Sequence, residues 1–305
     1  MKKYICIIMG IFILLLTAVG CSSSADKSLE SKSYAVDITD MSGNEIKLEK
    51  IPEKIVSLSP TNTELIFSVG AGSKLVGVTE QCDFPEEAKT IEKIGSFSEA
   101  NLEKIAEIKP DVVFAGGSIN ENLKTSLEEL EIPVVTIDSQ NIQDIFKSIE
   151  LTGKITGCET KSLEVISKMK ADLEQIKQKV EGLEPVSVFY VVWRDPFKTA
   201  GKNTFIDEAI TLAGGKNIAG NLEGWADYSR EELINQNPTG IIASQHFTIE
   251  EQTVDTLSSD ELFMDLDAAK AKKVHIITDD SKISRGGPRL VEAIDEMRIA
   301  IESWR

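Results

Sequence analysis

The amino-acid sequence predicts an α/β protein made of two lobes, each with a mainly parallel sheet, that are joined by one long helix. Short runs rich in β-branched residues alternate with longer helical segments, which is the pattern of parallel sheets with crossover helices. Two pairs of segments recur in the same order in the two halves. Between the halves lies a charged stretch without proline or glycine, residues 159–181, whose apolar residues have helical spacing.

The strands are expected where short apolar runs are bounded by proline, glycine or polar clusters. These runs are Lys54–Leu58, Lys74–Val78, Asp111–Ala115, Val134–Ile137, Val186–Val192, Gly240–Ala243 and Val274–Thr278. Each is too short for a stable helix, and helical stretches separate them. We therefore expect the two sheets to be mainly parallel.

The internal repeat divides these strands between two related lobes. The segment Glu64–Gly70 has the same six-residue step to a glycine as Glu208–Gly214. Downstream, Glu103–Pro110 corresponds to Glu231–Pro238, and each proline precedes an expected strand. The common order favours a duplicated lobe, with an extra segment in the first copy.

Two helices complete the expected fold. The long one carries an apolar stripe consisting of Leu163, Ile166, Met169, Leu173, Ile176 and Val180. At 1.5 Å per residue it would be about 33 Å long, and as a single link it predicts small lobe motions. A second helix ends the chain, with Trp304 on its apolar face and therefore in the core. The expected parts are a signal at 1–20, a tether at 21–33, a first lobe at 34–157, the joining helix at 158–184 and a second lobe at 185–305.

The N-terminus predicts secretion and a lipid anchor. Lys2 and Lys3 precede the apolar run Ile5–Leu16, which has the form of a secretory signal. Small residues then lead to Cys21, which resembles a bacterial lipobox, although Ala18 stands where leucine is usual. Cys21 would become the new N-terminus and carry fatty acyl chains such as palmitate, holding the protein at the extracytoplasmic face of the membrane. The alternative is an ordinary signal peptide with an incidental cysteine.

The charge excludes some classes of partner. The chain has 50 acidic and 33 basic residues and a net charge of −17. Loss of residues 1–20 would remove two lysines and no acid, leaving −19. Such a chain without a basic block is a poor candidate for binding nucleic acid. Cys82 and Cys158 would remain in the mature chain, either as two free thiols or as a disulfide.

The binding site is expected where strands of both sheets end, because ligands of open parallel sheets lie outside the carboxyl ends of the strands. Six loops should meet there. They are 59–61, 83–84, 116–117, 193–195, 244–246 and 279–285.

Several side chains in these loops could contact a ligand. Trp193 and Trp225 lie beside turn residues, and their rings could pack on a flat ligand or only on their own loops. His246 could ligate a metal or be an ordinary hydrogen-bonded loop residue. Arg194 and Arg285 could bind an anion, although Arg285 could equally satisfy loop carbonyls beside Gly286 and Gly287.

Several stretches, in the same order along the chain, resemble one protein family, the solute-binding proteins of the vitamin B12, ferric-siderophore and haem ABC importers. The stretches are 55–64, 76–79, 82–88, 101–103, 109–111, 199–202, 212–218, 229–231 and 287–289. The vitamin B12 subgroup is the most similar, because of the Asp83–Glu86 loop, the Trp225 loop and Ser229–Glu231. The family fold is two α/β lobes joined by one long helix.

The resemblance implies a monomeric, non-enzymatic protein without a resident cofactor that delivers its ligand to a permease dimer with ATPase subunits. It implies a corrinoid in the cleft, with a ferric siderophore or haem as alternatives. The expected ligand-binding residues are Asp83, Phe84, Phe97, Trp193, Arg194, Trp225, Tyr228, His246, Asp280 and Arg285.

Two glutamates are expected to dock the permease. Glu103 and Glu231 are each seven residues before the proline of their repeat, so a duplicated lobe would place them equivalently. Family members use glutamates at these positions for docking; the alternative is a pair of ordinary solvated helix acids. A secreted enzyme is the rival class, but the sequence has no HExxH, P-loop or GxSxG motif and only two histidines.

Overall fold

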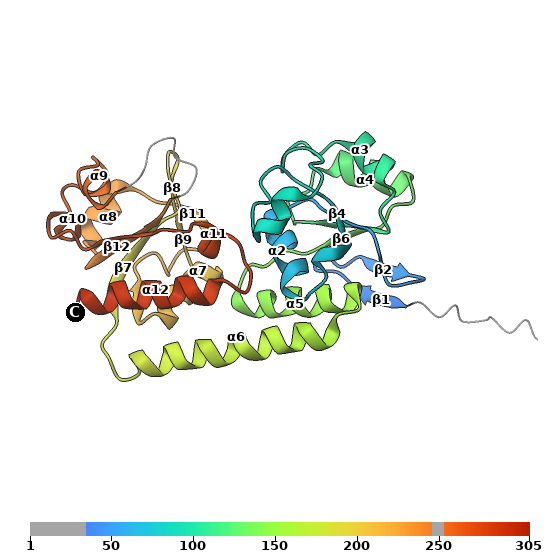
Figure 1. Cartoon of the computed structure of the whole chain (residues 1–305). Helices are drawn as coiled ribbons and strands as arrows, with labels where there is room; N and C mark the ends of the chain where they lie inside the picture. The colour runs from blue at the N-terminus through green and yellow to red at the C-terminus, as the bar shows by residue number, and fades with distance from the viewer. Residues whose placement is uncertain (1–34, 246–252) are drawn as a thin grey trace, which may run out of the picture. The chain divides into compact units, whose positions relative to one another are not determined.

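A computed structural model describes residues 35–245 and 253–305, which lie in one compact unit, Tyr34–Arg305. The unit contains two four-stranded sheets in which every pair of neighbouring strands is parallel (Figure 1). The first sheet has the order β4-β3-β5-β6 and the second β10-β7-β12-β13. Their strands are β3 Ile55–Ser57, β4 Leu75–Val78, β5 Val112–Ala115, β6 Val134–Thr136, β7 Val186–Val191, β10 Gly215–Asn217, β12 Gly240–Ser244 and β13 Val274–Ile277. Each run expected to be a strand is confirmed, and the part built on each sheet is here named a lobe.

The repeat seen in the sequence corresponds to a repeat in the structure. The helix after the first strand of each sheet is α2 Pro60–Ser68 in the first lobe and α7 Phe205–Leu212 in the second. Both are followed by a glycine in the left-handed region, Gly70 at φ +83° and Gly214 at φ +82°. The second matched pair is α3 Leu102–Ile108 and α8 Arg230–Gln236, and each precedes a central strand.

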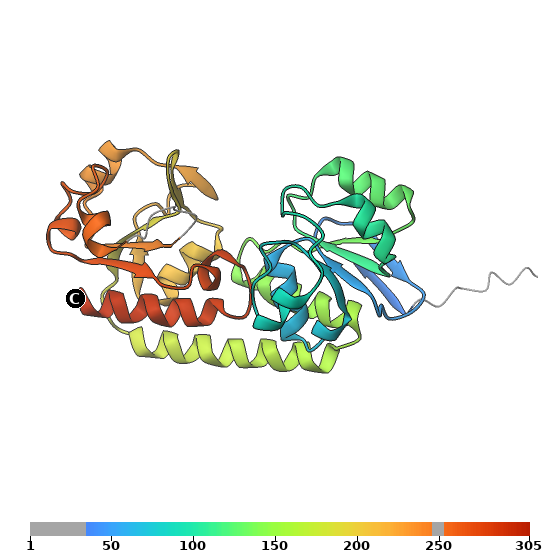
Figure 2. The same cartoon turned by 45° about the horizontal axis from the view of Figure 1, so that its top comes forward.

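The joining helix is α6 Glu159–Val180, with 22 residues. It packs against α5 Ile142–Thr156 of the first lobe and against α7 and α12 Leu290–Ser303 of the second (Figures 1 and 2). In the expected apolar stripe, Ile166, Met169, Leu173 and Ile176 are buried and Val180 is half-buried, whereas Leu163 is 59% exposed and Ser162 is buried in its place. The reason is steric, because Ser162 lies against Gly153 of α5, where even a Cβ would meet its Oγ at 2.3 Å.

The C-terminal helix confirms that Trp304 is a core residue. Trp304 is buried, and its ring lies so close to Gly240 of β12 that a Cβ there would meet it at 2.1 Å. The helix therefore closes the second lobe by packing on a strand that has no side chain at the contact.

Several antiparallel pieces were not expected from the sequence. β1 Val36–Thr39 and β2 Glu45–Leu48 pair at the start of the first lobe. In the second lobe, β8 Trp193–Arg194, β9 Phe197–Ala200 and β11 Trp225–Asp227 form a sheet of order β11-β9-β8. Segments that the sequence suggested were open loops are therefore partly strands.

The remaining elements are short or cover the sheets. They are η1 Gly72–Lys74, η2 Glu86–Thr90, α4 Glu121–Glu129, α9 Val254–Ser258, α10 Asp267–Lys270 and α11 Ser281–Ser284. Within residues 35–245 and 253–305, no helix is both long and apolar enough to span a bilayer. The expected signal, Cys21, the tether and His246 lie outside the described residues.

Candidate functional site

A cavity, here named the main cavity, lies where the strands of both sheets end, whereas a larger one of about 490 Å³ lies between α5, α6 and α7. The main cavity has a volume of about 220 Å³. The first lobe contributes Ser59 after β3, Gly116 and Gly117 after β5, and Asp138 after β6. The second lobe contributes Trp225 among others. The cavity therefore has walls from both lobes, as expected for a site at the carboxyl ends of parallel strands.

A second cavity of about 160 Å³ shares Trp225 and Ser284 with the first. Its other walls include Tyr190 of β7 and Asp280 before α11. The Trp225 ring is 43% exposed and stands edge-on to the ring of Phe205, with the centroids 5.6 Å apart. Trp225 thus presents apolar surface to both cavities.

The described residues that line these cavities include polar groups but no lysine or arginine. Ser59, Ser118 and Gln140 supply hydroxyl and amide groups to the main cavity. Among the described residues that line the two cavities, the charged ones are acids, Asp138 in the main cavity and Asp280 in the second. The site as described can therefore offer hydrogen bonds and aromatic contacts, but not a cation from its own walls.

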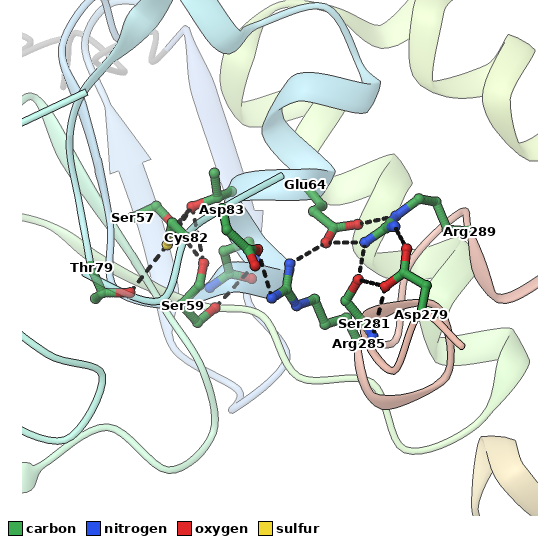
Figure 3. A network of polar contacts seen from close by, with 12 residues as sticks. Ser57, Ser59, Glu64, Thr79, Cys82, Asp83, Asp279, Ser281, Arg285 and Arg289 are labelled. Atoms are coloured by element: carbon green, nitrogen blue, oxygen red, sulfur yellow. Dashed lines mark hydrogen bonds and ion pairs between the residues drawn. The ribbon is translucent and has the colours of Figure 1, made fainter. Parts of the chain in front are cut away.

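Beside the cavities, two arginines of the second lobe meet a buried carboxylate of the first lobe (Figure 3). The carboxylate of Glu64, in α2, accepts hydrogen bonds from Arg285 Nη1 at 2.7 Å and from Arg289 Nε and Nη2 at 2.8 and 2.7 Å. The Glu64 side chain is 4% exposed, and those of Arg285 and Arg289 are 15% and 13% exposed. The contact with Arg289 is bidentate, which is the strong form of such a pair.

Two further carboxylates complete this group, here named the Glu64 cluster (Glu64, Asp83, Asp279, Arg285 and Arg289). Asp83 pairs with Arg285 and Asp279 pairs with Arg289, each at 2.8 Å. Burial would lower the pKa of both arginines, but the hydrogen bonds and charge of Glu64 outweigh it and raise the pKa. Burial would likewise raise the pKa of Asp279, but the Ser281 hydroxyl and the charge of Arg289 hold it below its ordinary value.

An aromatic ring and a thiol lie beside the Glu64 cluster. The Arg289 guanidinium stacks on the ring of Phe84, 3.7 Å from its centroid. Next to Asp83, the buried thiol of Cys82 contacts Thr79 Oγ1 at 3.1 Å (Figure 3). It also accepts a hydrogen bond from Thr63 Oγ1 at the same distance. Cys82 and Cys158 are both free, so the alternative with two thiols is confirmed.

The lobes also touch at a second place. Glu208 of α7 accepts a hydrogen bond from the backbone N–H of Ile142, the first residue of α5, at 2.7 Å. The N–H of Phe205 donates to the carbonyl of Gln140 at 2.7 Å. The carboxylate of Glu208 therefore satisfies a free N–H at the start of a helix in the other lobe.

The structure brings some expected site residues together. Phe97, Trp225 and Asp280 line the cavities, and the loops 59–61, 116–117, 244–245 and 279–285 all contribute to their walls. Asp83 and Arg285 lie in the Glu64 cluster, and Phe84 packs on it. Phe84 and Phe97 are 41% and 49% exposed, so apolar surface continues outside the cavities.

Other expected site residues lie elsewhere, because the chain after β7 continues into the β8–β9 hairpin. Trp193 is 36% exposed and donates from Nε1 to the carbonyl of Asp195 at 2.6 Å. Arg194 forms an ion pair with the buried carboxylate of Asp260. Neither side chain lines the two cavities.

Tyr228 also lies away from the two cavities. Its ring packs against Phe189, with centroids 5.0 Å apart, and edge-on to Phe197 at 6.3 Å. Burial raises its pKa to about 12. These contacts make it part of the packing of the second lobe.

Sequence reasoning missed Glu64, Arg289 and Asp138 as site residues. The sequence did contain one signal. Glu64 directly precedes Leu65 and Ile66 in α2, and a residue on the apolar side of a helix is normally buried. A carboxylate on a buried helix face calls for a cationic partner. The sequence alone does not say which one.

The two expected docking glutamates occupy equivalent places. Glu103 follows the first residue of α3, whose N-cap is Asn101, and Glu231 follows the first residue of α8, whose N-cap is Ser229. Both are exposed, and neither side chain forms a hydrogen bond or ion pair with another described residue.

The chain is similar to known solute-binding proteins. The family model described as periplasmic binding protein matches residues 55–281. An uncharacterised ABC transporter substrate-binding lipoprotein, YvrC of Bacillus subtilis, is 34% identical and covers 94% of this chain and 95% of its own length. The vitamin B12-binding protein of Vibrio campbellii is 32% identical over 64% of this chain and 71% of its own.

A solved structure supports the fold. A possible iron-binding (periplasmic solute-binding) protein from Staphylococcus epidermidis has a TM-score of 0.72 and 27% identity, covering 83% of this chain and 99% of its own. The match extends over both lobes and confirms the two-lobed α/β architecture expected from the sequence.

Proposed function

Because this chain belongs to the periplasmic binding protein family, we propose that it is the substrate-binding lipoprotein of an ABC importer and that it binds a corrinoid between its two lobes. The 34% identical relative bears the name of such a lipoprotein, and the 32% identical relative that of a vitamin B12-binding protein. The corrinoid is cargo, so the function needs neither a resident cofactor nor a catalytic step.

The observation that carries the corrinoid proposal is the chemistry of the cavity walls. A corrinoid is a flat ring system whose periphery bears neutral amides. Trp225 and Phe97 offer ring faces or edges to such a surface, and Ser59 and Gln140 offer hydrogen bonds to amides. The exposed rings of Phe84 and Phe97 extend the apolar surface beyond the cavity, as a ligand larger than 220 Å³ requires.

A ferric siderophore is the second candidate, because the relative from Staphylococcus epidermidis is described as possibly iron-binding. Haem is the third, since the vitamin B12, siderophore and haem importers use one type of binding protein. Both would occupy the same cavities, so one experiment compares all three.

The ligand proposal is tested by calorimetric titration of the mature protein, kept in a nonionic detergent, with cyanocobalamin, ferrichrome and haemin. We expect saturable binding of cyanocobalamin. Trp225→Ala should weaken it at least about tenfold, because aromatic anchors at the centre of a site carry much of the binding energy. Leu163→Ala, which truncates an exposed apolar side chain on α6, is the control. Tight binding of only ferrichrome or haemin would replace the corrinoid proposal.

The membrane attachment follows from Cys21. With a lipidated Cys21 as the mature N-terminus, residues 21–33 would tether the two lobes to the extracytoplasmic face of the cell membrane. The protein would work there as a monomer that carries its ligand to the permease dimer, whose ATPase subunits drive import.

Docking on the permease would use Glu103 and Glu231. Their matching positions in two related lobes suit a partner with two related subunits. Changing both to alanine should leave ligand affinity within about twofold and strongly reduce binding to the permease, because close charge pairs at an interface couple by about 1.5 kcal/mol or more. Glu107→Ala, in α3, is a matched control. Loss of ligand binding in the double variant would show that the two residues belong to the cleft.

A further inference from the structure

We propose that the cleft selects ligands without net negative charge, and that Glu64 is a specificity-determining residue because it occupies both arginines that could otherwise bind an anion. The inference rests on the proposed function, since it concerns the ligand of the same site. It names a property of the ligand that holds for a corrinoid and for other scaffolds alike.

The first step is the balance of charge in the Glu64 cluster. Arg285 and Arg289 bring two positive charges, whereas Glu64, Asp83 and Asp279 bring three negative ones. The cluster therefore carries a net charge of about −1 when all five groups are ionised. An incoming carboxylate would face an excess of negative charge.

The second step is the occupation of the arginine donors. Arg285 uses Nη1 on Glu64 and Nη2 on Asp83. Arg289 uses Nε and Nη2 on Glu64 and Nη1 on Asp279, and Nη2 also reaches Ser281 Oγ at 2.6 Å. An anion would have to displace a carboxylate that is already paired, so it gains little new interaction.

The third step is access. The two guanidinium groups belong to side chains that are only 15% and 13% exposed. The Phe84 ring also lies over Arg289 at 3.7 Å. The most exposed charged group of the Glu64 cluster is therefore a carboxylate, that of Asp83, which is 59% exposed, and not a guanidinium group.

The fourth step is the wall of the cavities themselves. Among the described residues, the charged ones that line them are Asp138 and Asp280. Arg194, the other arginine expected to bind an anion, is paired with Asp260. Like charges brought together in a partly desolvated site repel, whereas a neutral amide or an ammonium group can donate hydrogen bonds to these carboxylates.

The test uses pairs of ligands that share a scaffold and differ in charge. The pairs are dicyanocobinamide and dicyanocobyrinic acid, ferrioxamine B and its N-succinyl derivative, and haemin dimethyl ester and haemin. Affinities are measured by calorimetry on the mature protein in nonionic detergent. On each scaffold that binds, the less negative member should bind at least about tenfold tighter.

The outcomes separate this inference from the corrinoid proposal. If the two corrinoids bind equally well, or the acid binds better, the charge selection is overturned and the corrinoid proposal stands. If only ferrioxamine B or haemin dimethyl ester binds, and the more negative compound of the same pair does not, the charge selection stands and the corrinoid proposal falls. Failure of all three scaffolds overturns both.

The role of Glu64 is tested by Glu64→Gln, which keeps the size of the side chain and removes its charge. The preference for the less negative ligand should fall by at least about threefold, because a positive charge becomes available. Asp83→Asn, at an exposed position, is a second variant that puts folding at little risk and should shift the preference in the same direction. Glu208→Gln, at the equivalent position of the repeat but outside both cavities, should leave it unchanged. An unchanged preference in folded Glu64→Gln and Asp83→Asn would overturn the role of Glu64.

Discussion

Removal of the Glu64 carboxylate should destabilise the whole protein as well as change its ligand preference. Glu64→Ala would remove three hydrogen bonds from two arginine side chains that are 15% and 13% exposed. Breaking a buried ion pair by deleting one partner costs about 3–5 kcal/mol, because a charge is left buried without compensation. Since Asp83 and Asp279 still pair with the arginines, we expect the lower end, about 3 kcal/mol.

The assay is urea unfolding of the mature protein in nonionic detergent, followed by far-ultraviolet circular dichroism. Glu208→Ala is the matched control, because the equivalent glutamate of the second lobe accepts one hydrogen bond from a neutral donor, the Ile142 N–H. Loss of such a bond should cost about 1 kcal/mol. A cost for Glu64→Ala no larger than that for Glu208→Ala would refute the reasoning.

A double-mutant cycle with Arg289→Met isolates the pair itself. If Glu64 and Arg289 interact as the structure shows, the cost of Glu64→Ala should be smaller by at least about 1 kcal/mol when Arg289 is already replaced. Additive costs would mean that the bidentate contact contributes no coupling in solution.

The N-terminus, the contacts between the lobes and the carboxylate of Asp279 in the Glu64 cluster each support one further prediction. Cys21→Ser should release the protein from membrane fractions, and an intact Met1 terminus in mass spectra would contradict lipidation. Solution scattering with and without ligand should fit lobe orientations that differ by only a few degrees, because α6 and the Glu64 cluster both link the lobes. Closure by tens of degrees would refute this. Because the pKa of Asp279 is lowered in the folded state, its pairing contributes stability at neutral pH that is lost as the pH falls through that pKa. Between about pH 5 and pH 3, unfolding free energy should therefore fall more in the wild type than in Asp279→Asn, and equal slopes would contradict this sign.

The sheets and the joining helix were predictable because their signals are local. Each buried parallel strand appears as a short apolar run, as in Val112–Ala115, which is buried at every position. The apolar period of α6 is likewise a local signal, because it marks the face that packs against α5, α7 and α12. β10 Gly215–Asn217 was not predicted, because a glycine, a lysine and an asparagine do not form a strand pattern.

The candidate site was less predictable, because its contacts join residues far apart in the chain. Glu64 and Arg289 are 225 positions apart, and only the meeting of the lobes pairs them. Trp193 shows the opposite difficulty, a local signal that pointed to the wrong place. It directly follows a parallel strand, which is where a ligand-binding residue is expected. The chain there turns back at Asp195–Pro196 and pairs as β8 and β9, so Trp193 lies in a hairpin outside the two cavities.

The repeat explains why the lobes meet through two glutamates. Glu64 and Glu208 occupy the same place in the two copies, six residues before a left-handed glycine. Each carboxylate reaches a donor of the other lobe, an arginine pair in one case and the N–H of Ile142 in the other. If the two copies descend from one ancestral lobe, equivalent faces would meet at their junction, as in a symmetric dimer. The two contacts differ in chemistry, because only the one beside the cavities includes buried arginines, and those arginines link the packing of the lobes to the charge near the ligand site.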